Sequence, residues 1–307
     1  MAVPKHRIVS AARSRRPYLG LVSIASVLAL TACGGGGETE ESAPSVAADP
    51  ELTAMLPDDL RESGTITVGV DASYAPGQFL DTDGSTVIGF DVELFDAVAG
   101  KLGLRTQWEP APFGSIITGV DSGRYDAGVS SFTINPERLE QTNMVSYFNV
   151  GTQWFTRAGN PENVDPDNAC GLRVAVQKDT VQVPDIEARS EQCEEDGQEP
   201  ISIEQFEGQD QATESIVSGK NDAGLADMPV AVYAVEQTGD RLEALGEQYE
   251  AAPYGAVTAK ENTQLAEAIA AGYAAIIEDG TYQDILDEWG LTQGAVETPT
   301  VNPDIEA

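Results

Sequence analysis

Histidine, cysteine and positive charge are all scarce in this sequence of 307 residues. The one histidine, His6, lies in an N-terminal segment that we interpret below as a signal peptide. The remainder has no imidazole for a Ser-His-Asp triad, a Cys-His dyad or a histidine-ligated metal. We therefore predict no catalytic residues, no metal site and no cofactor. Catalysis by carboxylates stays open as an alternative.

The charge balance is strongly acidic, with 17 Lys and Arg against 51 Asp and Glu and a net charge of −34. A chain of this charge repels phosphates, which argues against nucleic acid as a partner. The hydrophobic content of 41% is ordinary, so the chain is expected to fold.

Only one stretch, residues 19–30, is strongly apolar, and it is too short to span a bilayer comfortably. Five basic residues precede it, which is typical of a cleaved export signal over residues 1–32. The residues that follow, Leu30-Thr31-Ala32-Cys33, resemble a bacterial lipobox. That resemblance implies cleavage before Cys33 and palmitate-type lipidation of its thiol, which would hold the protein on the outer face of the cell membrane. A plain secretory signal is the alternative.

Residues 34–50 are rich in Gly, Ser, Pro and acids, so we predict a flexible tether over residues 33–59. The tail, residues 293–307, is acidic and contains proline, and we predict that it is disordered.

Two further cysteines, Cys170 and Cys193, complete the inventory of thiols. An even number in an exported protein favours a disulfide over two free thiols. Cys170 precedes a predicted strand and Cys193 follows the next predicted helix. These two points meet at one edge of a sheet, so we predict that the pair is bonded.

Strand and helix patterns alternate along the chain. Residues 65–70 alternate in β-branched character, whereas Phe90, Leu94, Val98 and Leu102 mark one stripe of a helix. The second half repeats the plan with a strand over residues 173–176 and a helix over residues 183–191. The pattern predicts an α/β fold with parallel strands.

An internal match supports two similar halves. Residues 122–131, SGRYDAGVSS, align without gaps on residues 218–227, SGKNDAGLAD. In both halves two predicted strands end in polar side chains, and ligands bind beside the carboxyl ends of strands in open α/β sheets. The four side chains are Asp71, Ser131, Gln177 and Asp227. We expect two lobes that face each other across a cleft.

Several motifs resemble the bacterial extracellular solute-binding proteins that serve polar amino-acid importers, family 3. They are GFDVEL at residues 89–94, VDASYAP at 70–76, SSFTINPER at 130–138 and DGTY at 279–282. The resemblance covers residues 60–292. It implies a two-lobed periplasmic-binding-protein-like (type II) fold whose lobes are joined by two crossover strands. Lobe 1 would comprise residues 60–149 plus 254–292, and lobe 2 residues 155–250.

The resemblance also implies a ligand site. Arg138 matches the arginine that binds the ligand carboxylate, and Asp227 matches the aspartate that binds its ammonium group. Ser131 and Thr133 would add polar contacts, and Asp71 would reach a polar or cationic side chain. The other matching positions are the aromatic residues Tyr74 and Phe113 and the loop residues Gln177, Thr180, Val181 and Gln182. The sequence departs from the family at Gly77, where Phe is frequent, and at Asp179, where Gly is frequent.

The function that follows is the substrate-binding component of an amino-acid ABC importer, a monomer that closes around a free amino acid and delivers it to a membrane permease. The alternatives are a sensor subunit for a membrane receptor and a dehydratase-like enzyme on the same fold. Because Asp71 would lack a partner after Asp227 binds the ammonium group, we expect cationic amino acids to be favoured over glutamine or asparagine.

Overall fold

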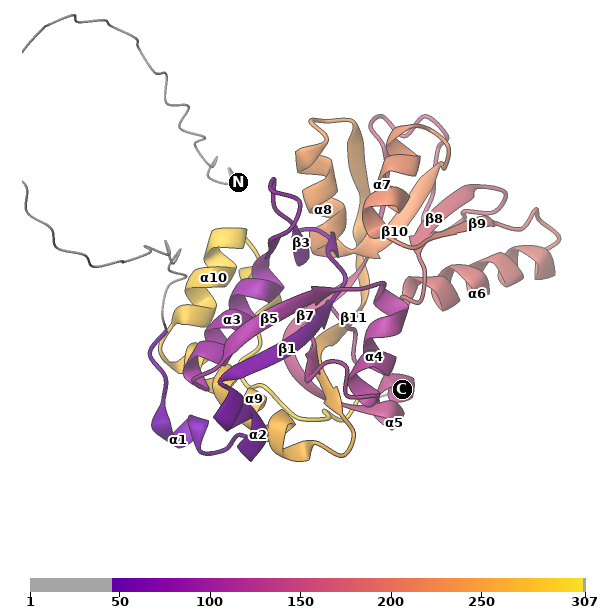
Figure 1. Ribbon diagram of the computed structural model, residues 1–307. Coiled ribbons are helices and arrows are strands. Elements are labelled where there is room, and N and C mark those ends of the chain that lie inside the picture. Colours follow the sequence, from indigo (N-terminus) through magenta and orange to yellow (C-terminus); the bar gives the residue numbers. More distant parts are fainter. Residues whose placement is uncertain (1–45, 306–307) are drawn as a thin grey trace, which may run out of the picture. The chain divides into compact units, whose positions relative to one another are not determined.

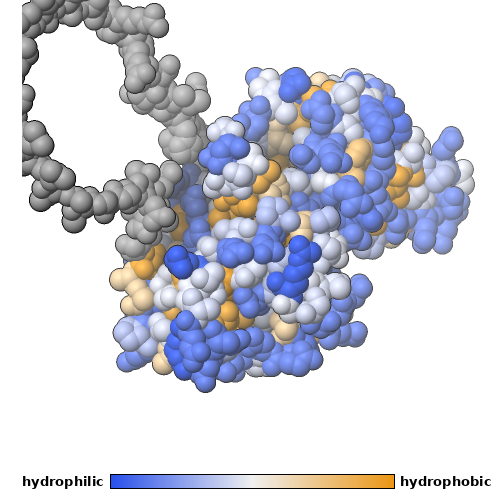
Figure 2. Space-filling model, viewed as in Figure 1, coloured by the Kyte–Doolittle hydropathy of each residue, from blue (hydrophilic) through white to orange (hydrophobic). Residues whose placement is uncertain are grey.

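The computed structural model describes residues 46–305, which form one compact unit (Figure 1). The predicted signal peptide, Cys33 and the first part of the predicted tether lie outside these residues. No helix among residues 46–305 is both long and apolar enough to cross a membrane. Hydrophilic residues cover most of the face shown in Figure 2, which is consistent with the acidic composition.

The strands are β1 Thr65–Val70, β2 Ser73–Tyr74, β3 Gln78–Leu80, β4 Val87–Ile88, β5 Arg105–Pro110, β6 Ala127–Gly128, β7 Thr142–Arg157, β8 Arg173–Gln177, β9 Ser202–Phe206, β10 Ala223–Asp227 and β11 Leu242–Ala259. The helices are α1 Pro50–Thr53, α2 Asp58–Ser63, α3 Phe90–Lys101, α4 Phe113–Asp121, α5 Pro136–Gln141, α6 Gln182–Glu195, α7 Gln209–Val217, α8 Met228–Gln237, α9 Thr263–Glu278 and α10 Thr281–Trp289, with a 3₁₀ turn at Thr292–Gly294.

Two long antiparallel strands pass from one half of the molecule to the other. β7 has 16 residues and β11 has 18, and they stand in the middle of an eight-stranded sheet of order β5-β1-β6-β11-β7-β10-β8-β9. β1 pairs in parallel with β5 and β6 in the first lobe, and β8 pairs in parallel with β9 and β10 in the second. The predicted α/β class and the two-lobed arrangement are confirmed.

Hydrophobic cores lie on both faces of the sheet in each lobe. In the first lobe α3, α9 and α10 pack on one face around Phe90, Phe148 and Tyr273. Consecutive residues of β7 point to opposite faces, so in the second lobe Phe155 packs with α7 and α8 while Trp154 packs with α6. Each lobe therefore has its own hydrophobic core on both faces of its part of the sheet, and the two long strands connect the lobes.

The internal repeat has a structural counterpart. Asp126 accepts a hydrogen bond from the backbone N–H of Thr67 at 2.8 Å, and Asp222 accepts one from that of Arg173 at 2.9 Å. Each aspartate thus links the turn before one strand, β6 or β10, to the first half of the neighbouring parallel strand, β1 or β8. The same local sequence builds the same sheet corner twice.

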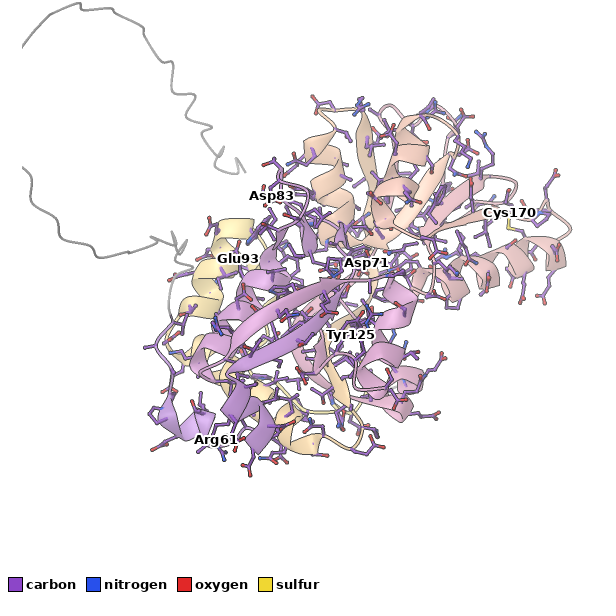
Figure 3. The ribbon with its side chains drawn as sticks, viewed as in Figure 1. Arg61, Asp71, Asp83, Glu93, Tyr125 and Cys170 are labelled. Atoms are coloured by element: carbon purple, nitrogen blue, oxygen red, sulfur yellow. A yellow bond between two sulfur atoms is a disulfide. The ribbon has the colours of Figure 1, made fainter. Side chains whose placement is uncertain are left out.

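Cys170 and Cys193 form a disulfide with a Cα–Cα separation of 5.6 Å, as the sequence predicts. Cys170 lies before β8 and Cys193 near the end of α6. Figure 3 shows the bond at the end of the second lobe that is remote from the first.

The prediction of a disordered tail is wrong for residues 293–305. Residues of the tail lie along the first-lobe part of β7: the N–H of Ser146 donates to the carbonyl of Thr300 at 2.9 Å, and the N–H of Asn302 donates to that of Met144 at 2.8 Å. Along β7, β10 pairs only with the second-lobe part. The tail pairs with the first-lobe part of the same edge of β7, which β10 leaves free. Unpaired backbone groups along β7 explain the order of this acidic segment.

The predicted tether is also shorter than expected. Residues 50–53 and 58–63 are helical, and Leu56 between them is wholly buried against the first-lobe core. Val46 and Leu52 also pack against this core, so a few apolar side chains hold the otherwise polar segment on the lobe.

Candidate functional site

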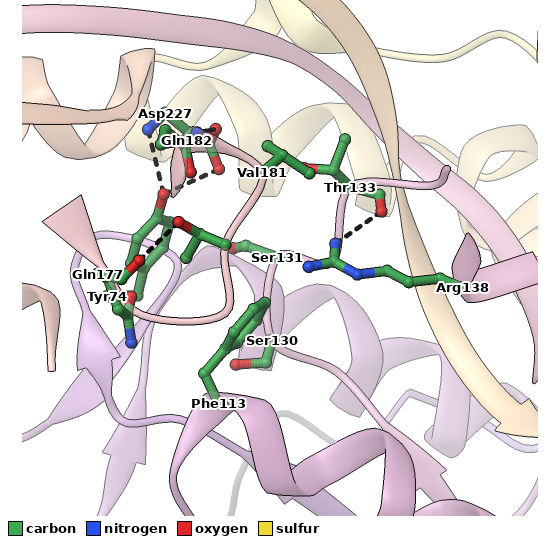
Figure 4. Close-up of a pocket in the computed structure, with 11 residues that line it drawn as sticks. Tyr74, Phe113, Ser130, Ser131, Thr133, Arg138, Gln177, Val181, Gln182 and Asp227 are labelled. Atoms are coloured by element: carbon green, nitrogen blue, oxygen red, sulfur yellow. Dashed lines mark hydrogen bonds between the residues drawn. The ribbon is translucent and has the colours of Figure 1, made fainter. Parts of the chain in front are cut away.

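A pocket opens between the two lobes where strand ends and helix starts from both meet (Figure 4). It is lined by Tyr74, Phe113, Ser130, Ser131, Thr133, Arg138, Gln177, Thr180, Val181, Gln182 and Asp227. Ten of these residues are predicted ligand contacts, and they come from segments as far apart as β2 and β10. The structure therefore brings together nearly the whole predicted site.

Arg138 enters the pocket from α5. Asn135 caps this helix by accepting from the N–H of Arg138 at 2.9 Å, which fixes where the arginine side chain leaves the backbone. The guanidinium donates to the carbonyl of Thr133 at 2.8 Å and to that of Asp179, in the other lobe, at 3.2 Å. It lies 5.4 Å from the ring centre of Phe113.

The guanidinium of Arg138 has no carboxylate in ion-pair contact among residues 46–305. Burial lowers the pKa of Arg138 to about 10, and the nearby Asp227 opposes that shift. The side chain is only 8% exposed and remains cationic at neutral pH. A buried cation without an anion is suited to bind an anionic group.

Asp227 ends β10 and precedes α8, so its side chain reaches the pocket from the second lobe. Its Oδ2 accepts from the hydroxyl of Tyr74 at 2.9 Å and from that of Tyr254 at 2.5 Å. Its Oδ1 accepts from Nε2 of Gln182 at 2.8 Å. Burial raises the pKa of Asp227, with the Tyr254 and Tyr74 hydroxyls opposing. All three donors are neutral, so the negative charge remains available to a cationic group.

Asp71 is the one predicted ligand residue that does not line the pocket. It lies between the lobes (Figure 3), and its Oδ2 accepts from Nε2 of Gln177 at 2.7 Å and from the N–H of Phe113 at 3.2 Å. Burial raises the pKa of Asp71 as well. Gln177 thus stands between this carboxylate and the pocket.

Ser130 and Tyr254 are functional candidates that the sequence did not single out. Ser130 lines the pocket and accepts from the backbone N–H of Asp71 at 3.0 Å. Tyr254 lies on β11 behind Asp227. The position of Ser130 inside the SSFTINPER motif was a usable signal. Tyr254 also stands in a stretch that resembles the family, at Tyr254-Gly255, but that resemblance assigned it no contact with Asp227.

The two departures from the family pattern have local explanations. Asp179 has a φ of +63°, a left-handed conformation that glycine adopts freely and aspartate tolerates. At Gly77 a Cβ would approach Oγ of Ser131 to 2.9 Å and the carbonyl oxygen of Tyr74 to 3.2 Å. Ser131 therefore occupies the space that a larger residue at position 77 would need.

The pocket is nearly filled by its own side chains, with a free volume of about 10 Å³. That is about the space of one water molecule. Direct hydrogen bonds join the lobes across it, from Tyr74 to Asp227 and from Gln177 to Asp71. A small organic ligand can enter only if these contacts separate.

Two α/β lobes, two crossover strands and an enclosed polar pocket between them define a two-lobed solute-binding protein. Residues 66–292 match the family of bacterial extracellular solute-binding proteins, family 3, and the chain belongs to that family. The predicted family is confirmed.

Individual relatives agree with this assignment. The chain is 38% identical over 254 residues to the arginine-binding protein ArgT of Corynebacterium glutamicum, covering 82% of this chain and 83% of that protein. It is 25% identical to the L-cystine-binding protein TcyJ of Escherichia coli, covering 75% and 84%. Among solved structures, an ancestral arginine-binding protein bound to arginine has a TM-score of 0.68 and 29% identity, covering 74% of this chain and 98% of that one.

Proposed function

We propose that the protein is the substrate-binding component of an amino-acid ABC importer and that L-arginine heads its ligands. One observation carries the proposal: Arg138 and Asp227 line one pocket from opposite lobes. A zwitterionic amino acid offers a carboxylate to the first and an ammonium group to the second. Each buried charge then gains a partner, and the ligand itself links the lobes.

The remaining contacts follow from the pocket lining. Ser131 and Thr133 would bind beside the carboxylate, as would the loop of Thr180 and Val181, and Tyr74 and Phe113 would flank the side chain. Asp71, reached when Gln177 moves aside, would supply the charge for a cationic end group. An acidic ligand would need a second base, and the nearest candidate, Lys178, is exposed and engaged by Glu207 at 3.0 Å.

Relatives support the ranking of ligands. The names of ArgT and of the ancestral structure both specify arginine. Another solved structure, of an ancestral arginine-binding protein, is described as bound to glutamine and has a TM-score of 0.67 to this chain. We therefore place L-arginine first, other cationic amino acids next and L-glutamine behind them.

The binding cycle would be an opening and closing of the lobes about the crossover strands, with bending near residues 150–154 and 251–254. β7 and β11 pair irregularly in this region, with register shifts between Leu245 and Tyr249, between Tyr249 and Ala252, and between Tyr254 and Gly255. A ladder interrupted in this way bends more readily than a continuous one.

We propose binding without turnover, by a monomer that Cys33 would attach to the outer face of the cell membrane. Arg138 and Asp227 are suited to hold opposite charges, and the names of the relatives cited specify binding proteins. NMR of L-arginine incubated with the protein should show unchanged ligand, whereas accumulation of a product would support the dehydratase-like alternative.

Calorimetric titration tests the ligand. The panel is L-arginine, L-lysine, L-ornithine, L-histidine, L-glutamine, L-asparagine, L-cystine, L-glutamate and L-aspartate. We expect L-arginine to bind most tightly. Tight binding of glutamate or aspartate without a response to arginine or glutamine would contradict the assigned pocket.

A further inference from the structure

Asp91 is a wholly buried carboxylate beneath the pocket that takes no part in its lining. It is the second residue of α3 and follows Gly89 and Phe90, which begin the helix. An aspartate in the first turn of a helix normally reaches solvent, where it favours the helix dipole at little cost. Complete burial requires a different explanation.

The carboxylate of Asp91 is directed at Ser131. Its Oδ2 accepts from the backbone N–H of Ser131 at 3.0 Å and lies 2.9 Å from the Ser131 hydroxyl, which donates to it. Ser131 has a φ of +51°, in the left-handed region that serine rarely occupies. Two hydrogen bonds to one buried carboxylate compensate for that unfavourable conformation.

A buried polar network extends from this pair under the pocket. The Ser131 hydroxyl is 3.2 Å from Oε1 of Gln78, whose Nε2 donates to Ser130 at 3.3 Å. Ser130 in turn accepts from the N–H of Asp71. Gln78 and Asp91 are both fully buried, so the loop that carries Ser130 and Ser131 rests on groups that no solvent reaches.

Ser131 stands two residues before Thr133, whose carbonyl accepts from the guanidinium of Arg138 at 2.8 Å. The backbone direction at Ser131 therefore decides where that carbonyl points. We propose that Asp91 is a positioning residue: it holds Ser131 in its left-handed conformation and so aligns the Ser131–Thr133 loop with Arg138. It does this without contacting the ligand. The inference about affinity rests on the proposed function, whereas that about the loop does not.

The charge state of Asp91 is consistent with this role. Burial raises the pKa of Asp91 to about 6, while the nearby Tyr147 and the hydrogen bonds from Ser131 oppose the shift and the charge of Asp227 adds to it. Tyr273, on α9, also faces this carboxylate. At neutral pH Asp91 is thus mainly ionised, which is the stronger acceptor for the Ser131 N–H.

The experiment compares Asp91→Asn with Asp96→Asn. Asp96 lies five residues further along α3, accepts from Thr106 and Trp108 of β5 and does not line the pocket, so it controls for loss of a carboxylate on the same helix. Hydrogen exchange of the Ser131 amide is measured in the protein without ligand, and L-arginine affinity by calorimetry. We expect Asp91→Asn to speed that exchange and weaken binding about tenfold, and Asp96→Asn to change neither.

A mutant cycle separates positioning from a general structural effect. Glycine tolerates the left-handed conformation, so in a Ser131→Gly background Asp91→Asn should change affinity by less than about twofold. If Asp91→Asn does not fold, Ser131→Gly and Ser131→Ala are compared, since both lack the hydroxyl and differ in their tolerance of positive φ. The glycine variant should bind more tightly.

Unchanged Ser131 exchange in Asp91→Asn would overturn the proposal, as would an undiminished affinity loss in the Ser131→Gly background. An alanine variant that binds as tightly as the glycine variant would do the same. A wild-type protein that binds no amino acid would instead refute the proposed function, and the exchange measurement would still decide the role of Asp91 in the loop.

Discussion

Tyr254 and Asp227 connect a crossover strand to the second lobe: the tyrosine hydroxyl donates to Oδ2 of the aspartate at 2.5 Å. Tyr254 is 1% exposed and Asp227 is 5% exposed, so a water molecule cannot take the place of either group as the hydrogen-bond partner of the other. Together with Tyr74 and Gln182, Tyr254 keeps a negative charge stable in the interior before any ligand is considered.

Removing the Tyr254 hydroxyl should destabilise the protein. Tyr254→Phe leaves Asp227 with one donor fewer, and we expect a loss of about 1–3 kcal/mol in the free energy of unfolding. Urea titration followed by circular dichroism measures it. Tyr273→Phe is the matched control, because the Tyr273 hydroxyl is buried in the same lobe without a hydrogen-bond partner among the described residues. An equal loss in both variants would show that the Asp227 contact is unimportant.

Arg138→Ala and Asp227→Ala should each abolish measurable binding while the fold survives. Removing one partner of a buried charge contact costs about 2–5 kcal/mol or more, which is about 30-fold to several thousand-fold in affinity. Calorimetry with L-arginine measures the loss, and circular dichroism checks the fold. Binding by either variant within about threefold of wild type would mean that the assigned pose is wrong.

Acid should weaken binding while it favours the fold. Burial raises the pKa values of Asp71 and Asp227, so both are protonated more readily in the folded protein than in the unfolded chain. Asp91, whose pKa is raised to about 6, is likewise protonated more readily in the folded protein. The stability that these groups contribute is complete below their ordinary value of 3.8 and is lost as pH rises through the folded value. Protonated Asp227, however, no longer attracts an ammonium group.

Thermal unfolding at pH 7 and pH 5, with and without L-arginine, measures both effects. The ligand-induced rise in Tm should shrink at the lower pH. Asp222 does not interfere, because its pKa is lowered and its contribution is lost only below 3.8. A ligand-induced rise that grows on acidification would contradict the roles given to Asp71 and Asp227.

Loss of the disulfide should lower stability but leave the pocket intact. Cys170 and Cys193 are 23 residues apart, and a cross-link of that loop size contributes about 3 kcal/mol on the chain-entropy account. The Cys170→Ala/Cys193→Ala variant should therefore unfold at lower urea concentration and bind L-arginine as wild type does. Unfolding of wild type with and without a reductant is the companion measurement, and a shift in the variant alone would point to packing instead.

Motifs predicted which residues line the pocket where neighbours in sequence are also neighbours in space. Thr133 lies just before helix α5, which carries Arg138, and the SG–DAG repeat placed Asp227 at the end of its strand. Asp71 illustrates the limit, because only the approach of Gln177 from the other lobe decides whether its carboxylate faces a ligand. Similarly, composition could not reveal that Leu56 fastens the predicted tether or that β7 needs a partner for part of its length.

The ordered tail bears on where the folded domain ends. The family match stops at residue 292, yet Ala295, Thr300, Val301 and Asn302 bond to β7 beyond that point. A protein shortened to residue 292 would expose strand backbone at Met144 and Ser146, which is a template for pairing with a second chain. Light scattering of that shortened protein against the full chain should show self-association, even though every residue lining the ligand pocket is present in both.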